Sequence, residues 1–203
     1  MIRETYKRAS DHLRWLIAIG LSLGSALWFE PQATSVLAKP GQAAASEPTV
    51  AAFNERVKQY IKLREQAEGQ LPKLSKKSTP AEIEANLVAL QKGIIAARAG
   101  AKPGDIFTPD IADHIRQVIK QEFKGQRLRE LRETVREAET KGVPLRVNAP
   151  YPETKELTEM PPTLLLKLPT LPKQLHYRFV GRSMLLLDKE ARLIVDYFPT
   201  AMP

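Results

Sequence analysis

The sequence predicts an α+β fold: a small antiparallel bundle of three to four helices, then a Pro-rich segment, then a short C-terminal antiparallel β meander. Apolar residues recur at helical spacing across residues 48–142. Seven prolines then fall between positions 144 and 172, which opposes helix and favours extended chain. After position 172, short apolar runs alternate with turn residues, as in adjacent strands. We therefore expect one domain in which the helices precede the strands.

The first helix is expected to begin near Pro48 and to end at Gly69, after a flexible lead-in over residues 39–47. The second begins at Thr79, where a capping residue, a proline at the first helical position and Glu82 of a capping box coincide. We expect Gly100 to close it. Its buried stripe is predicted to comprise Ile83, Leu87, Leu90, Ile94 and Ala97.

A third helix is predicted to begin at Thr108 and Pro109 by the same capping logic. Gly125 interrupts the pattern that follows it, so residues 126–140 are either a fourth helix or a kinked extension of the third. These helices complete the helical region, residues 48–142.

Residues 143–203 are predicted to contain the Pro-rich segment and the strands. Residues 164–168 could form a short edge strand between two prolines. Three strands are expected over residues 175–180, 184–187 and 193–198, with turns at Gly181-Arg182 and at residues 188–190. A sheet this small needs a partner, so its apolar face should pack on the helices.

Residues 1–38 have the three parts of a secretory signal peptide in the right order. Arg3, Lys7 and Arg8 make the start basic, residues 15–29 are uncharged and apolar, and a polar stretch ends at Ala38. The apolar run would make a helix of about 22 Å, short for a hydrocarbon core of about 30 Å. We predict an exported protein, periplasmic or secreted, cleaved after Ala38 or near Ala45. The alternative is an inner-membrane protein anchored by residues 15–29.

The C-terminal strands carry the segments YRFVGR at 177–182, LLLD at 185–188 and LIVD at 193–196. This ending resembles the C-terminus of uncharacterised exported bacterial proteins, over about 25 residues. The resemblance carries no motif of known chemistry. It implies an address in the bacterial envelope and a short C-terminal hairpin module.

Composition excludes several kinds of site. The chain has 203 residues and no cysteine, which excludes disulfides, thiol nucleophiles and Cys-ligated metal centres.

The net charge of the chain is positive. It carries 31 Lys and Arg against 23 Asp and Glu, a formal charge of +8. A basic surface attracts anions, so an anionic envelope polymer, lipid headgroups or an envelope protein is the expected partner. Nucleic acid is not expected, because few aromatic residues lie among the basic ones.

The basic residues most suited to such contact are Arg116, Lys120, Lys124 and Arg127. Their spacings of four, four and three place them along one helical face if the helix continues through Gly125. This anionic-surface strip is the candidate contact, and the alternative is an ordinary solvated face.

No catalytic, cofactor or metal site is predicted. Asp110 and His114 lie one helical turn apart but lack a third ligand. His176 alternates with Tyr177 along a strand, and Ser183 lies in no nucleophile motif. The sequence thus favours a non-enzymatic binding or accessory module. Its rivals are a hydrolase, marked by a deep pocket gathering a histidine with carboxylates, and a structural subunit that pairs through edge strands.

Overall fold

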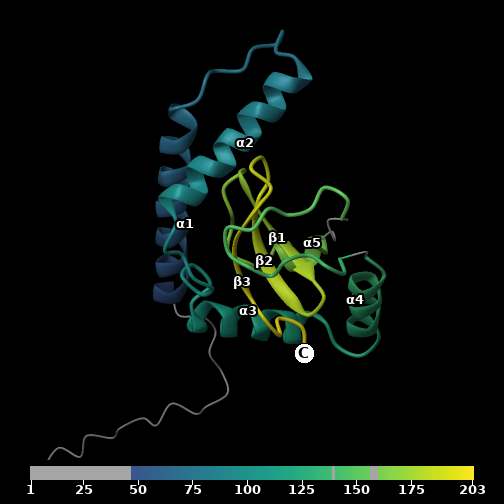
Figure 1. Cartoon of the computed structure of the whole chain (residues 1–203). Helices are drawn as coiled ribbons and strands as arrows, with labels where there is room; N and C mark the ends of the chain where they lie inside the picture. Colours follow the sequence, from purple (N-terminus) through teal and green to yellow (C-terminus); the bar gives the residue numbers. More distant parts are fainter. Residues whose placement is uncertain (1–46, 139, 156–159) are drawn as a thin grey trace, which may run out of the picture. The chain divides into compact units, whose positions relative to one another are not determined.

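The computed structural model of the chain describes residues 47–138, 140–155 and 160–203 (Figure 1). The predicted signal peptide and residues 39–46 of the predicted lead-in lie outside the described residues. Glu47, assigned to that lead-in, is instead the first residue of a helix. None of the helices in the described ranges is long and apolar enough to span a bilayer.

The predicted α+β class is confirmed, with the helices preceding a three-stranded antiparallel sheet. The elements, in chain order, are α1 (Glu47–Gly69), α2 (Pro80–Ala97), α3 (Pro109–Glu122), α4 (Gln126–Glu137), α5 (Pro162–Leu165), β1 (Leu175–Val180), β2 (Ser183–Asp188) and β3 (Leu193–Phe198).

Helices α1 and α2 form a hairpin whose second helix starts as predicted. Thr79 Oγ1 accepts a hydrogen bond from the Glu82 amide at 3.3 Å, and the Thr79 amide donates to Glu82 Oε2 at 2.7 Å. This is a complete capping box with Pro80 as the first helical residue. The helices approach closely at Gly93, because a methyl group there would come within 3.2 Å of the Ala67 Cβ atom.

The predicted buried stripe of α2 is only partly correct. Leu90 and Ile94 are buried, whereas Ile83 is 50% exposed and Ala97 is exposed. The helix also ends at Ala97, before Gly100. The first turns of α2, residues 81–85, are exposed, and its burial increases towards Leu90.

Helices α3 and α4 are separate, which settles the open question about residues 109–140. Phe123 is extended (φ −111°, ψ 107°), and Gly125 has φ +54°, a value that favours glycine. The helical hydrogen-bond ladder therefore stops between them. Each helix still buries an apolar face, with Ile115 in α3 and Leu131 in α4 among the core residues.

The loop before α3 is held by a buried carboxylate of β3. Asp196 is fully buried and accepts hydrogen bonds from the amides of Gly104, Ile106 and Phe107 at 2.9, 2.7 and 2.7 Å. Burial raises the pKa of Asp196, and these amide donors oppose the rise. The N-terminal end of α3 is thus fixed to the sheet.

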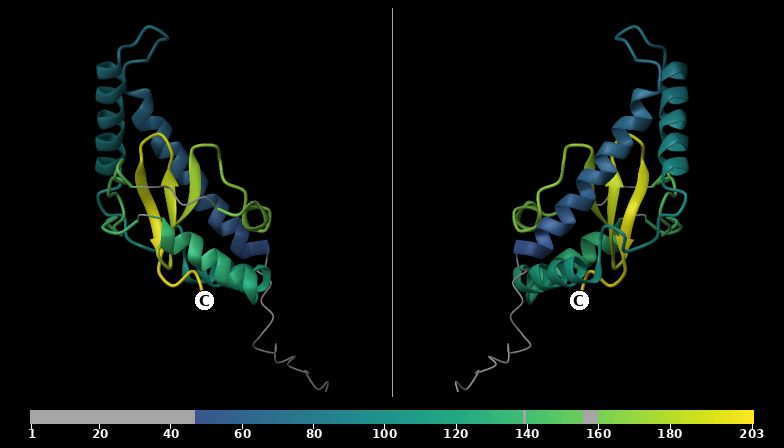
Figure 2. Two further views of the ribbon diagram at one scale, coloured as in Figure 1. Left: turned by 90° about the vertical axis from the view of Figure 1, so that its right-hand side faces the viewer. Right: turned by 90° about the vertical axis from the view of Figure 1, so that its left-hand side faces the viewer.

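The three strands pair in the order β1-β2-β3, as the meander prediction required. A bulge shifts the register of β2 against β3 between Leu186 and Leu187. Tyr177 and Phe179 of β1 belong to the main apolar core with residues of α1, α3 and α4, so the sheet packs on the helices as expected. Figure 2 shows α1 and α3 beside the sheet in both views.

The second face of the sheet is covered by the Pro-rich segment. Val143, Ala149 and Tyr151 form a smaller apolar cluster with residues of the three strands. The Asn148 amide donates to the Ile194 carbonyl at 2.8 Å, and the Tyr151 amide donates to the Arg192 carbonyl at 2.7 Å. These bonds occupy part of the free edge of β3, which reduces the surface available for pairing with another strand.

The predicted edge strand at residues 164–168 is wrong, because the short helix α5 ends at Leu165 and a turn follows it. Leu164 and Leu168 are buried whereas Leu166 is 84% exposed, which is the spacing of a helical turn and not of a strand. Pro161 and Pro162 explain the difference: a proline suits the first turn of a helix, where its missing N–H is not needed.

Candidate anion-binding site

The turn between β2 and β3 sends charged side chains to both faces of the sheet. Asp188 and Glu190 contact Arg64 of α1, whereas Lys189 and Arg192 line a cavity on the opposite face. The two groups differ in how their charges are paired.

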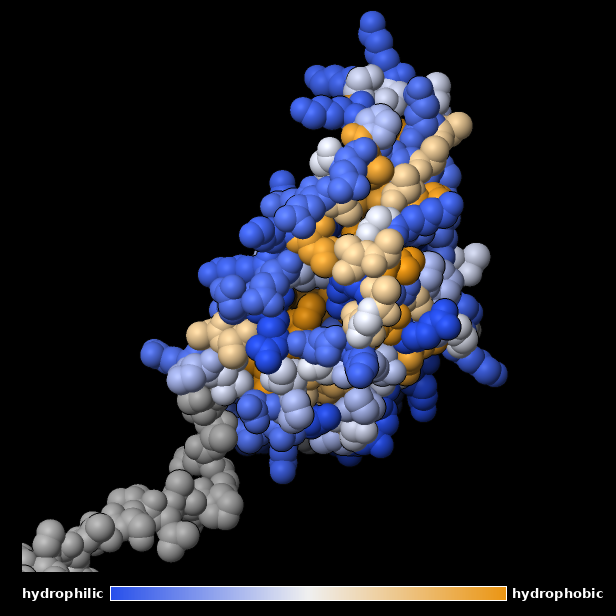
Figure 3. Space-filling view, turned by 60° about the vertical axis from the view of Figure 1, so that its left-hand side comes forward, coloured by the Kyte–Doolittle hydropathy of each residue, from blue (hydrophilic) through white to orange (hydrophobic). Residues whose placement is uncertain are grey.

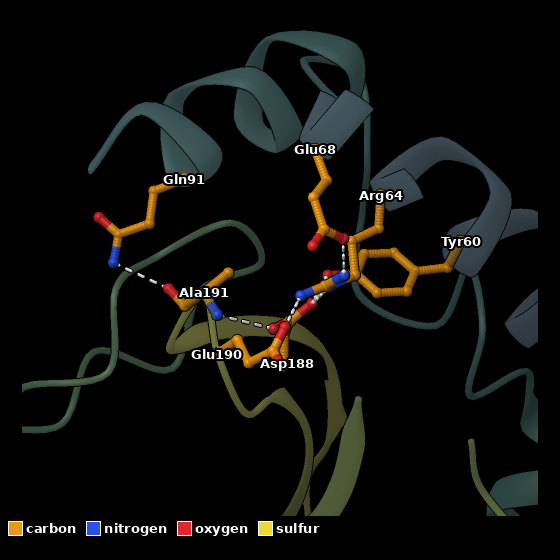
Figure 4. Close-up of polar contacts among 7 residues, drawn as sticks. All are labelled: Tyr60, Arg64, Glu68, Gln91, Asp188, Glu190 and Ala191. Carbon is orange, nitrogen blue, oxygen red and sulfur yellow. Dashed lines mark hydrogen bonds and ion pairs between the residues drawn. The ribbon is translucent and has the colours of Figure 1, made fainter. Parts of the chain in front are cut away.

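On the helical side, Arg64 is surrounded by carboxylates (Figure 4). Only 2% of its side chain is exposed, and Asp188 is fully buried. The Arg64 Nε atom donates to Asp188 Oδ2 at 2.9 Å, and Nη1 donates to Glu68 Oε2 at 2.6 Å. Its Nη2 atom pairs with Glu190. Every nitrogen of the guanidinium group therefore has an acidic partner.

Asp188 is satisfied in the same way. It accepts a hydrogen bond from the Tyr60 hydroxyl at 2.7 Å and from the Ala191 amide at 2.8 Å. The Ala191 carbonyl in turn accepts from Gln91 Nε2 of α2 at 2.8 Å (Figure 4). The cluster ties α1 and α2 to the turn.

The electrostatics of this cluster agree with a structural role. Burial raises the pKa of Tyr60, and Asp188 raises it further. Burial alone would lower the pKa of Arg64, but Asp188, Glu190 and Glu68 outweigh that effect and raise it. Arg64 therefore stays charged and Tyr60 stays protonated near neutral pH.

On the other face, a cavity of about 230 Å³ lies between the sheet and the Pro-rich segment. Among the described residues, no acidic side chain lines it. Its walls consist of one aromatic, one aliphatic and four basic side chains: Tyr151, Leu187, His176, Arg178, Lys189 and Arg192.

The alternation of β1 brings two of the basic residues together. His176 and Arg178 are two positions apart and share a face, while Tyr177 between them points into the main core. His176 pairs with Leu187 of β2 in the sheet register. Arg192 closes the cavity from the turn, where it adopts the left-handed conformation with φ +48°, a strained value for a residue other than glycine.

The buried atoms His176 Nε2 and Arg192 Nε in this cavity have no hydrogen-bond partner among the described residues. Arg178 Nη2 lies 3.4 Å from His176 Nδ1, and in the tautomer that accepts this contact Nε2 carries the ring proton and can donate. The terminal Arg192 Nη2 atom reaches the Pro152 carbonyl only at 3.4 Å. Burial lowers the pKa of His176, and the positive charges of Arg178 and Lys189 lower it further. A concave site with converging N–H donors and unbalanced positive charge is suited to an oxyanion.

The chain matches no family model, and comparisons with curated proteins and with solved structures found no match. The candidate site is therefore identified from its own geometry.

The predicted strip lies elsewhere and is not continuous. The helix that its alignment required ends at Glu122, so Arg127 belongs to α4 and pairs with Glu122 at 3.6 Å. Arg116 already has partners within the protein, because it donates to the Thr200 and Pro199 carbonyls and stacks on a phenylalanine ring. Lys120 and Lys124 remain exposed on α3 and just beyond it. Contact of these residues with an anionic surface stays a prediction.

The histidines are separated. His114 lies in α3, and His176 is the only histidine lining the cavity on the sheet. In the described part of the chain, no three His, Cys, Asp or Glu side chains are grouped so that they could hold a metal ion. Ser183 is buried at the start of β2. The hydrolase alternative predicted a deep pocket in which a histidine lies beside carboxylates. In the cavity that contains His176, the neighbouring charged side chains are Arg178, Lys189 and Arg192 instead.

Sequence reasoning missed Arg64, Asp188 and Asp196 as buried charges. For Arg64 a signal exists, because it follows Val57 and Tyr60 at the helical spacing of the buried face. The partners of Arg64 on the turn are 124 and 126 residues away in sequence, and one sequence carries no sign of that pairing.

Proposed function

We propose that this protein is an exported, non-enzymatic binding module that recognises an oxyanion group, a phosphate or a carboxylate, on a component of the cell envelope. The observation that carries the proposal is the cavity in which His176, Lys189 and Arg192 present donors and positive charge. Export is supported by the three-part leader in residues 1–38.

The size of the cavity favours a small anion or the charged end of a larger molecule. Sites for drug-sized ligands have volumes of about 300–1,000 Å³, and this cavity has about 230 Å³. The charged head of an envelope polymer, peptide terminus or phosphorylated metabolite fits that volume, whereas an extended ligand would have to lie mostly outside it.

The energetic argument rests on unsatisfied donors. A buried N–H group without a partner costs about 1–3 kcal/mol, and a hydrogen bond to a charged group contributes about 1.5–3 kcal/mol. An oxyanion placed between His176 Nε2 and Arg192 Nε would satisfy both atoms and offset the repulsion among the neighbouring cations. Apolar walls such as Tyr151 and Leu187 strengthen such bonds by excluding water.

The test is isothermal titration calorimetry of the chain with inorganic phosphate and with acetate, at constant ionic strength set by sodium chloride. We expect binding of at least one of the two anions, weakened about tenfold or more by the double variant Lys189→Gln/Arg192→Asn. Asn tolerates the left-handed backbone at position 192, so this variant removes charge without a backbone penalty.

The matched control is Lys141→Gln/Lys167→Gln, which removes the same charge at two exposed positions outside the cavity and should leave the affinity unchanged. Equal weakening by both double variants would show general charge attraction and contradict the proposal. Absence of binding by the unaltered chain, for both anions, would contradict it as well.

A further inference from the structure

Within the described part of the chain, the hydrogen bonds of the α1–α2 hairpin tip, residues 70–79, run within the tip itself and to its own two helices. The Leu71 amide donates to the Glu68 carbonyl at 3.0 Å, and Asn86 Nδ2 of α2 donates to the Pro72 carbonyl at 2.9 Å. In both views of Figure 2 this loop lies at the end of the hairpin remote from the sheet. The tip therefore projects beyond the sheet.

The tip is basic. Lys73, Lys76 and Lys77 are exposed, and the sequence has no acidic residue between Glu68 and Glu82. Glu82 itself accepts hydrogen bonds from the amide and hydroxyl of the N-cap residue of α2. Positive charge is thus concentrated at the end of the hairpin without an acidic residue inside the loop.

The tip and the first turn of α2 that follows it expose large apolar side chains. Leu74 is 46% exposed and Ile83 is 50% exposed. Leu74 lines a surface depression of about 400 Å³ together with Pro72, Ala85 and Ala89, and the polar residues Lys73, Ser78, Glu82 and Asn86 complete its wall. Figure 3 shows hydrophilic side chains at this end of the molecule and apolar ones directly below them along the hairpin.

We infer that the hairpin tip docks on an anionic lipid bilayer, with Leu74 and Ile83 at the boundary between headgroups and acyl chains and the three lysines among the headgroups. Lysine side chains extend their apolar stems along a membrane surface while the ammonium groups reach the phosphates. A soluble polyanion would require the lysines alone, so it does not explain the exposed apolar side chains beside them. The charge complementarity with anionic lipid accounts for both features.

The experiment uses the chain from Pro40, because residues Pro40–Pro203 form a compact unit of their own that contains the whole described core. The sequence has two tryptophans, Trp15 and Trp28, and both precede Pro40. A Leu74→Trp variant therefore carries a single tryptophan at the tip. With vesicles of equimolar phosphatidylcholine and phosphatidylglycerol, its emission should shift to the blue, and with pure phosphatidylcholine vesicles it should not.

Vesicle co-sedimentation then measures the role of charge. Replacing Lys73, Lys76 and Lys77 by Gln should weaken binding to the anionic vesicles roughly 100-fold, since each lysine near such a surface contributes about fivefold. A matched triple change of Lys141, Lys167 and Lys173 to Gln, three exposed lysines outside the tip, should change it much less. Ile83→Ser should also weaken binding without unfolding the chain, because Ile83 is half exposed.

Several results would overturn the inference. Equal loss in the two triple variants would assign binding to net charge. A tryptophan shift that appears without lipid and grows with protein concentration would assign the tip to a second copy of the chain. Tight binding of soluble polyphosphate with no blue shift on vesicles would assign it to a soluble polyanion. Absence of any shift on anionic vesicles would exclude bilayer docking.

Discussion

The two sides of the β2–β3 turn use charged residues in opposite ways. Towards α1, one buried arginine meets three carboxylates, and all of its nitrogens are paired. Towards the Pro-rich segment, four basic side chains converge on a cavity that no described acidic side chain lines. Residues 188 and 190 belong to the first group and residues 189 and 192 to the second. Residues 188–192 thus contribute to one group of charges that is neutralised by ion pairs and to another in which positive charge is in excess.

The comparison separates stability from recognition. The partners of a fully paired buried charge offset its desolvation cost, and removing one partner leaves an uncompensated charge. Donors left without partners are tolerated at a cost, and a ligand of opposite charge removes that cost. The Arg64 group should therefore affect folding, and the Arg192 group should affect binding.

The largest expected effect is the loss of stability when the ion pairs around Arg64 are broken. Asp188→Ala would leave Arg64 Nε, the Tyr60 hydroxyl and the Ala191 amide without their acceptor. We expect the free energy of unfolding to fall by about 3–5 kcal/mol, measured by urea denaturation followed by circular dichroism.

A double variant sharpens the interpretation of that loss. Arg64→Met with Asp188→Leu removes both charges together, so it should recover part of the stability lost in Asp188→Ala. If Asp188→Ala unfolds at the same urea concentration as the unaltered chain, the cluster has no structural role and the comparison fails.

The next largest effect is the pH dependence of the affinity of the His176 cavity for an anion. The pKa of His176 is lowered by burial and by Arg178 and Lys189, with Asp188 opposing the shift. The ring is therefore neutral near neutral pH, and protonation on acidification adds a positive charge to the cavity. We expect sulfate, whose charge is constant in this range, to bind about fivefold more tightly at about pH 5 than at about pH 8.

Calorimetry at the two pH values provides the measurement, and His176→Gln should remove the dependence while leaving some binding. A dependence of the same size in His176→Gln would assign the titration to another group. Tighter binding at the higher pH would contradict the sign of the effect.

The smallest effect should be the stability change on removing a cation from the cavity. Lys189→Gln relieves repulsion from Arg178 and Arg192 and breaks no ion pair in the described structure. The free energy of unfolding should change by no more than about 0.5 kcal/mol, in contrast to the loss on the other side of the same turn. A loss comparable to that of Asp188→Ala would show that Lys189 is a structural residue.

The sequence predicted the parts of the fold that depend on local signals. The capping box at Thr79 and the turn at Gly181 depend only on residues that are neighbours in sequence. The predicted bounds of α2 and of the strands are therefore close to the observed ones. At α5 two local signals compete: proline density favours extended chain, whereas Pro162 also suits the first turn of a helix. Burial of Leu164 against α3 decides between them, and that contact is not local.

The candidate site was predictable only in part. The alternation that separates His176 from Tyr177 was visible in the strand pattern, and it places Arg178 on the same face as His176. The cover supplied by Tyr151 was not visible, because it depends on how the Pro-rich segment pairs with β3. The strip through Arg116 and Lys124 failed as a continuous face because propensity alone could not show whether Gly125 kinks a helix or ends it.

The most direct test of the central claim is a nuclear magnetic resonance titration of the histidine rings in the chain from Pro40, with and without phosphate. That chain retains His114 and His176 of the three histidines, and burial lowers the pKa of both. If the cavity binds an oxyanion, phosphate should raise the pKa of His176 and leave that of His114 unchanged. Equal shifts of both rings, or no shift of His176 at saturating phosphate, would contradict the claim.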